Sequence, residues 1–181
     1  MKKQSMIIVI ILFMSTFLYS LDLKSKEYDL GFMVGLWMGG DVNIEGYSAD
    51  KDGCLLIRGF ADAYLIPKLA MGAYFNFSPA TIETEDITVF EFGGSIKPRF
   101  LIREDLAIKP GLNIGYRTAS GDEPEIEMDG FALNLSIEVQ KAMETMILSF
   151  EGGFLSQPAG GNEWVEISWA PIMYLGAGLT F

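Results

Sequence analysis

Charged side chains recur at alternate positions within apolar stretches of this sequence, and they are its strongest candidates for a functional site. Five bases and four acids share the pattern: Arg58, Asp62, Glu91, Lys97, Arg99, Lys109, Arg117, Glu138 and Glu151. Because the opposite charges nearly balance, the set could close an interior with ion pairs, or line a narrow path that selects ions. A carboxylate pair such as Glu138 and Glu151 could also serve as acid and base, but no feature of the sequence brings a substrate near them.

The residue types that are missing exclude several other chemistries. The 181-residue chain has no histidine, which excludes Ser-His triads and imidazole metal sites. Cys54 is its only cysteine, so neither an intramolecular disulfide nor a cysteine-rich zinc site can form. The net charge of −11 argues against nucleic-acid binding, which needs a basic face. We therefore predict no enzymatic activity, no catalytic residue, no metal site and no cofactor.

The elements that carry these charges show a period of two, which is typical of β-strands. Leu69, Met71 and Ala73, for example, alternate with Ala70 and Gly72. Blocks of this kind fall near 30–37, 54–66, 69–77, 87–100, 106–117, 131–140, 146–154 and 167–181. The sequence therefore predicts an all-β protein of eight strands.

The connections between these blocks alternate in length. Long connections are expected near 39–53, 79–86, 118–129 and 155–164, and short ones near 67–68, 101–105 and 142–144. A Greek-key sandwich does not need this order, whereas an outer-membrane up-and-down barrel has short periplasmic turns and long outer loops. The pattern predicts an eight-stranded antiparallel up-and-down transmembrane β-barrel.

The side on which the charges lie supports a membrane barrel. Within the predicted strands, the charges keep to the positions between the apolar ones, and a base facing lipid at mid-depth would cost roughly 2–4 kcal/mol. The charges should therefore face the lumen. An eight-stranded barrel is just wide enough to be filled by its own side chains, which favours a paired, closed interior over a gated path. A secreted barrel of lipocalin type would place its apolar face inside instead.

Aromatic residues mark the predicted edges of the lipid-facing surface. Six of them share the apolar positions near the long connections: Phe77, Phe90, Tyr116, Phe131, Phe154 and Trp169. Phe100 and Phe181 lie at the opposite ends of their strands. We interpret these residues as the two aromatic girdles of a membrane barrel, the alternative being the aromatic core of a sandwich.

A few residues conflict with a regular barrel. Pro98, Pro110 and Pro171 fall inside predicted strands, where proline interrupts the ladder, so we expect local bulges there, or strand limits that differ from those given above. Leu56 and Phe60 occupy lumen positions of the second strand, and a bulge near Gly59 would shift that register.

Acidic residues gather in the predicted long connections. These segments hold 13 acids and one base, Lys51. The connection between the fifth and sixth strands is the most acidic, with Asp122, Glu123, Glu125, Glu127 and Asp129. Such a loop could meet an extracellular ligand or gather divalent cations, although a solvated surface is the simpler interpretation.

The N-terminal residues have the pattern of an export signal. Lys2 and Lys3 precede an apolar run from Met6 to Leu18, and Ser20 offers a small residue for cleavage. We predict a signal peptide over residues 1–20 and one barrel domain over residues 21–181, the alternative for the first segment being a retained anchor.

The C-terminal residues carry a family resemblance. Tyr174, Gly176, Leu179 and Phe181 match the terminal assembly signal of bacterial outer-membrane barrels, with an aliphatic Leu179 where an aromatic residue is frequent. With the signal peptide and eight strands, the chain resembles the small OmpA/OmpX-like barrels. The resemblance implies recognition by the barrel-assembly machinery, contact with outer-membrane lipid, and a structural or surface-interaction role. A narrow channel for ions or small solutes is the alternative.

Overall fold

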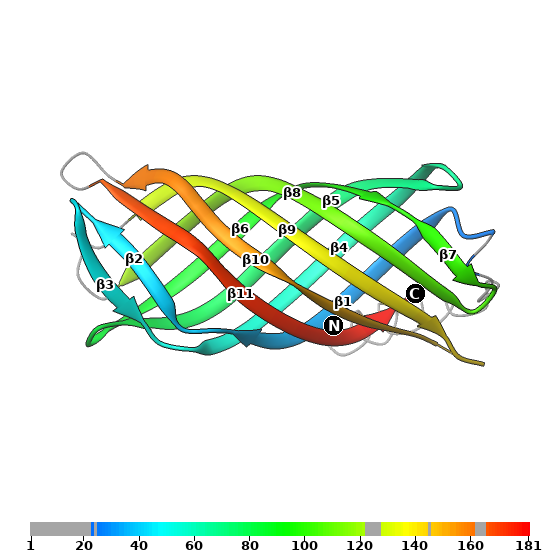
Figure 1. Ribbon diagram of the computed structural model, residues 1–181, viewed down its shortest axis with the longest axis horizontal. Helices are drawn as coiled ribbons and strands as arrows, with labels where there is room; N and C mark the ends of the chain where they lie inside the picture. Colours follow the sequence, from blue (N-terminus) through cyan, green and yellow to red (C-terminus); the bar gives the residue numbers. More distant parts are fainter. Residues whose placement is uncertain (1–22, 24, 122–127, 145, 162–165) are drawn as a thin grey trace, which may run out of the picture.

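The computed structural model describes residues 23, 25–121, 128–144, 146–161 and 166–181. Its strands are β1 (Tyr28–Trp37), β2 (Gly40–Ile44), β3 (Tyr47–Lys51), β4 (Cys54–Ile66), β5 (Leu69–Ile82), β6 (Glu85–Pro98), β7 (Phe100–Arg103), β8 (Leu106–Gly121), β9 (Met128–Ala142), β10 (Ile147–Gly161) and β11 (Ile167–Thr180). They form one antiparallel sheet that closes on itself (Figure 1). Within these residues, no helix is long and apolar enough to cross a membrane.

The eleven strands make up eight barrel strands, because three of the eight are interrupted by a short break. β2 continues β1 after a break at residues 38–39, β4 continues β3 after 52–53, and β7 continues β6 after Arg99. The barrel closes where β1 pairs with β11, for example Phe32 with Leu179. The predicted fold, an eight-stranded antiparallel up-and-down barrel, is confirmed.

The burial pattern is the reverse of that in a soluble protein. Polar and charged side chains fill the interior, and among them Lys97, Lys109 and Glu138 are fully buried. Large apolar side chains point outward and stay exposed, such as Phe92 at 55% and Leu135 at 59%. Because a lipocalin-type barrel would bury its apolar face, this pattern contradicts that alternative.

Two of the predicted long connections are strand extensions rather than loops. Residues 40–51 form the β2–β3 hairpin, whose turn residues Glu45 and Gly46 both have positive φ, as a type I′ turn requires. β5 and β6 likewise run to a two-residue turn at Glu83–Thr84. The strands therefore project well beyond the predicted girdle at this end, on the left in Figure 1.

A bulge in β11 corrects the predicted orientation of Trp169. Leu155 pairs with Ile172 but Gln157 pairs with Trp169, so β11 holds one extra residue here and Ala170 and Pro171 are both exposed. The extra residue reverses the alternation, and Trp169 is only 2% exposed, inside the barrel. Trp169 is thus not part of the aromatic girdle. Phe90, Tyr116, Phe131 and Phe154 do face outward, and Phe77 packs edge-on against Phe90.

Of the bulges expected at prolines and at Gly59, the structure contains only some. The bulge predicted at Pro171 is present, but the register runs without a shift through Gly59 and through Pro110. Pro110 lies opposite the break between β6 and β7, since the residues two before and two after it pair with Phe100 and Ile96. Its missing N–H therefore costs no ladder bond on that side. At Gly59, the Phe75 ring lies where a side chain would stand, 2.2 Å from an ideal Cβ.

Candidate functional site

The structure brings the nine predicted lumen charges together inside the barrel. They come from β4, β6, β8, β9 and β10, with Arg99 at the β6–β7 break, and none is more than 2% exposed. The alternation of the strands puts them on the inner wall, and the closure of the sheet brings distant positions within contact distance. Eight of them form two networks, and Arg99 bonds backbone carbonyls instead.

The first network lies nearer the end that carries β7. Lys97 bonds Asp62 at 2.8 Å and lies 3.6 Å from Glu138, while Lys109 lies 2.9 Å from Glu138. Ser95 and Ser149 donate to Asp62 and Glu138. Both ammonium groups also lie over the Phe60 ring, at 4.2 and 5.7 Å from its centroid. Every charge here therefore has at least one opposite partner, as a buried charge requires.

Asp29 is a member of this network that the sequence did not reveal. Its carboxylate lies 2.8 Å from Lys109 and 2.7 Å from Lys26, and it accepts bonds from Tyr64 and Gln140. Asp29 sits directly before Leu30, on the lumen parity of the first strand. Extending the predicted strand by two residues would have found it, because Tyr28 and Leu30 already alternate around it.

The chain before β1 packs against the barrel at this end. Leu23 is fully buried in a cluster with Ala107 and Ile147. Its carbonyl accepts a bond from Arg99, whose guanidinium also donates to the Pro67 carbonyl and lies 3.9 Å from the Tyr64 ring centroid. Arg99 therefore ties this N-terminal segment to the β4–β5 turn.

The second network lies further from β7, towards the end of the barrel that carries the β2–β3 hairpin. Arg58 lies 3.3 Å from Glu151, and the Tyr174 hydroxyl donates to the same carboxylate. Arg117 donates twice to Glu91, at 2.5 and 2.9 Å. Amide groups complete the coordination of Glu91, since Asn76 and Asn134 also donate to it.

Above the second network the interior becomes apolar. The Trp37 and Trp169 rings stack at 5.1 Å between centroids, and the Arg117 guanidinium lies about 5 Å from both. The Lys51 ammonium also lies over the Trp37 ring, 4.2 Å from its centroid, and donates to two backbone carbonyls. A cluster of buried apolar side chains surrounds the stack: Val42, Ala49, Leu56, Ala80, Ile82, Ile87, Val89, Ala119, Leu155, Ile167 and Ile172. Of this layer, the sequence had placed Leu56 at a lumen position, but an apolar layer was not anticipated.

The tips of the hairpins at this end are acidic. Eight acids of the predicted long connections lie among the described residues, and all are exposed: Asp41, Glu45, Asp50, Asp52, Glu83, Glu85, Asp86 and Asp129. In the described parts of those connections Lys51 is the only base, and it is buried. Asp122, Glu123, Glu125 and Glu127 lie outside the described residues, as does the predicted signal peptide.

The predicted assembly signal forms the end of β11. Tyr174 points into the lumen and Leu179 points outward, while Gly176 pairs with Gly35 of β1. Phe181 follows the strand and exchanges two backbone bonds with Leu30. The terminal residues thus complete the barrel seam, and recognition by the assembly machinery stays a prediction.

A solvent-exposed ion pair lies at the opposite end, in the β7–β8 turn. Asp105 accepts a bond from Lys141 and lies 3.4 Å from Arg103. The bond from the Lys141 ammonium lowers the pKa of the Asp105 carboxyl. Among the described residues, no group of histidine, cysteine and acidic side chains is arranged to hold a metal.

A closed eight-stranded barrel with a charged interior and an apolar exterior is the architecture of small outer-membrane proteins. No family model and no curated protein sequence matches the chain. Among solved structures, Neisserial surface protein A is similar, with a TM-score of 0.64 and 14% identity over 84% of this chain and 94% of its own. The outer membrane protein OprG from Pseudomonas aeruginosa follows, with 0.58 and 12% over 85% and 94%. Ail, the attachment invasion locus protein of Yersinia pestis, gives 0.50 and 14% over 86% and 100%. At these identities the likeness establishes the fold.

Proposed function

We propose that this protein is an outer-membrane β-barrel with a structural or surface-interaction role. The lumen is closed, and the acidic hairpin tips face the outside. The exposed apolar belt supports the membrane position, because so many large apolar side chains facing water would be costly for a soluble protein. The solved structures that share this fold include proteins described as outer-membrane or surface proteins.

The main support for the proposal that the lumen is closed is the apolar layer around the stacked Trp37 and Trp169 rings. It lies between the ion-pair networks and the hairpin tips. An ion crossing it would lose its hydration shell among mostly apolar side chains, with the buried Lys51 and Gln157 beside the two rings, and such a layer forms a hydrophobic barrier. Leu23 and Arg99 support closure at the other mouth.

The alternative function is a narrow channel. It draws support from polar atoms in the middle of the barrel, where the Asn113 amide and part of the Arg58 guanidinium are buried without a protein partner among the described residues. Water is the usual partner for such groups. These groups lie below the apolar layer, so we favour a hydrated but closed interior.

The charge of the outer end defines the class of partner. Ail has been solved in complex with a heparin analogue, sucrose octasulfate. The exposed acids of this chain would repel such a polyanion, because its hairpin tips carry no exposed base in the part of the chain that the structure describes. We propose that the outer end engages a positively charged ligand or divalent cations.

The role we propose is not enzymatic. Glu138 and Glu151, the carboxylates considered as an acid and base pair, face each other across β9 and β10. Each is buried and held by its own cations, so neither has an open side where a substrate could bind.

The test is ion conductance of the refolded full-length protein in a planar bilayer. Only protein whose electrophoretic band shifts on heating, a sign of a folded barrel, should be scored. We expect folded protein without discrete current steps. Current steps would overturn the closed lumen and make Arg58, Lys97 and Lys109 candidates for ion selectivity.

A further inference from the structure

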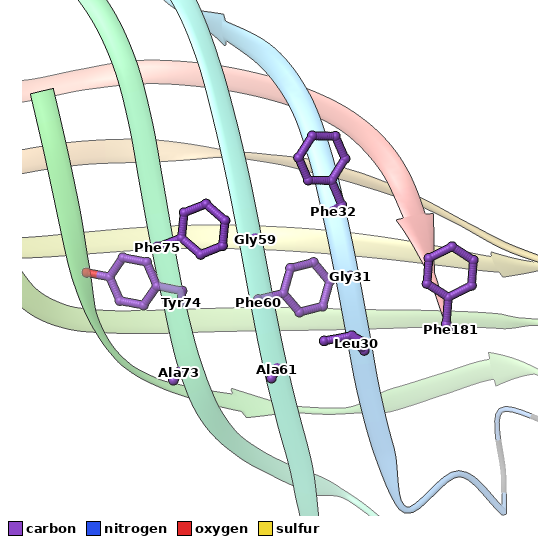
Figure 2. A pocket seen from close by; sticks show the side chains of 10 residues that line it. All are labelled: Leu30, Gly31, Phe32, Gly59, Phe60, Ala61, Ala73, Tyr74, Phe75 and Phe181. Atoms are coloured by element: carbon purple, nitrogen blue, oxygen red, sulfur yellow. The ribbon is translucent and has the colours of Figure 1, made fainter. Parts of the chain in front are cut away.

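The outer wall of the barrel carries an apolar groove over β1, β4 and β5. Its volume is about 340 Å³, and its lining is almost entirely carbon. Figure 2 shows its ridges, formed by Leu30, Phe32, Phe75 and Phe181. The floor consists of Ala61 and Ala73, two small residues of the outer face, together with the backbone of Gly31. The Phe75 ring covers Gly59, and a side chain at Gly31 would point into the lumen against Phe60. The groove is therefore a place where small side chains lie between large ones on the outer wall.

The register of the strands explains why the gap is continuous. Ala61 pairs with Ala73, so two methyl groups lie side by side on the outer face. Gly59, two residues along β4, pairs with Phe75 and leaves room for its ring. Phe181 extends the opposite ridge through its backbone bonds to Leu30.

The groove lies near the middle of the membrane, within reach of a lipid whose headgroup lies at the short β4–β5 turn. Ala61 lies six residues before Pro67, in the short turn that joins β4 to β5. At about 3.3 Å per residue and a tilt near 40°, the groove lies on the order of 15 Å from that turn, about half of the hydrocarbon thickness. The turn also carries Lys68, which is exposed. The short turns are the periplasmic side of the proposed orientation, so the groove lies below a base at the inner-leaflet surface.

We infer that this groove holds one acyl chain of an anionic phospholipid of the periplasmic leaflet, with the headgroup near Lys68. The inference rests on the proposed membrane position. A groove of 340 Å³ equals roughly eleven water volumes of ~30 Å³, room for a stretch of hydrocarbon chain. A second copy of the chain would need about 800 Å² on each partner, far more than this groove offers.

Photo-crosslinking tests the inference directly. The full-length chain is refolded in phosphatidylglycerol bilayers that contain a trace of phosphatidylglycerol with a diazirine in the middle of one acyl chain. We expect label on the peptides of the groove to exceed that around Leu135 and Ile137, on β9, by at least fivefold. Uniform labelling around the barrel would overturn the inference.

Matched variants separate the groove from the rest of the wall. Ala61→Leu with Ala73→Leu fills the floor and should reduce groove labelling at least fivefold. Ala170→Leu with Ala177→Leu adds the same bulk at exposed outer positions of β11 that do not line the groove or lie between it and Lys68, and should leave the labelling unchanged. Equal labelling of the two double variants would contradict the inference.

The headgroup is tested with a phosphatidylcholine probe that carries the same diazirine. We expect weaker groove labelling from this zwitterionic lipid, and we expect Lys68→Gln to remove the difference. Equal labelling by both lipids in the unmodified chain would overturn the assignment to an anionic lipid. A chain that fails to insert, with no band shift on heating, would instead refute the proposed membrane barrel itself.

Discussion

At the scale of single residues, the interior of this barrel is governed by the cost of burying charge. Moving an ion out of water costs several kcal/mol, and only good pairing offsets it. Glu91 receives bonds from Arg117 and from two asparagines, and Lys109 bridges Asp29 and Glu138. Removing one partner should therefore cost more than the pair itself contributes.

Arg117→Met tests this asymmetry. The variant leaves the Glu91 carboxylate buried without its cation, and we expect a loss of about 3–5 kcal/mol in the free energy of unfolding. The double variant with Glu91→Gln should recover part of that loss. Urea unfolding in lipid vesicles gives the measurement. The control is Arg103→Ala, which removes an exposed partner of Asp105 and should cost less than about 1 kcal/mol. A loss for Arg117→Met no larger than the control would contradict the argument.

A second prediction concerns two acids of the outer hairpin. Asp41 and Asp50 are register partners on β2 and β3, and both are exposed. Like charges at opposed positions destabilise a sheet, so Asp50→Lys should raise the free energy of unfolding by about 0.2–1 kcal/mol. The control Asp52→Lys makes the same change in net charge outside the β2–β3 ladder. An equal effect of both variants would show that net charge, rather than the cross-strand pair, is responsible.

At the scale of elements, one extra residue in β11 decides what the upper lumen contains. The bulge at Ala170 and Pro171 turns Trp169 inward, where it stacks on Trp37 and completes the apolar layer. Without the bulge, Trp169 would lie among the lipid-facing aromatic residues. A backbone irregularity thus moves a residue predicted for the girdle into the apolar layer of the lumen.

Quenching by brominated lipid should show the inward orientation of Trp169. In a variant that keeps Trp169 and replaces Trp37 and Trp164 with phenylalanine, we expect the fluorescence to be almost insensitive to brominated acyl chains. The reference variant replaces all three tryptophans and introduces Phe131→Trp on the outer wall, where quenching should be strong. Comparable quenching in both variants would place Trp169 in the lipid and refute the bulge.

At the scale of the whole molecule, the fold separates three chemical environments. The outer wall is apolar, the lumen is charged and paired, and the hairpin tips are acidic. Because the ladders close the barrel independently of the tips, the tips are free to vary without loss of the scaffold.

Deleting residues 122–127 tests that separation. The segment lies between the end of β8 and the start of β9, so its removal shortens a connection without removing a ladder pair. We expect the band shift on heating to be retained, and any binding of basic ligands or divalent cations to weaken, since four acids are lost. A deletion variant that cannot fold would contradict the view that the barrel is an independent scaffold.

The sequence alone determined the fold class and the side on which the charges lie. Strand alternation is a local property, so a period of two and a balanced set of charges were enough to predict eight strands with a polar interior. Asp29 was missing from the predicted lumen charges only because the first strand was predicted to begin at residue 30, two residues later than it does.

The tertiary structure alone decided which charges pair and which side chains form the apolar layer of the lumen. Lys109 meets Asp29 across 80 residues, and Arg58 meets Glu151 across 93, because barrel closure and shear set these distances. The same holds for the bulge in β11, since an extra residue is recognised only against a neighbouring strand. The apolar groove likewise depends on register, because Ala61 and Ala73 form one floor only when β4 and β5 are aligned.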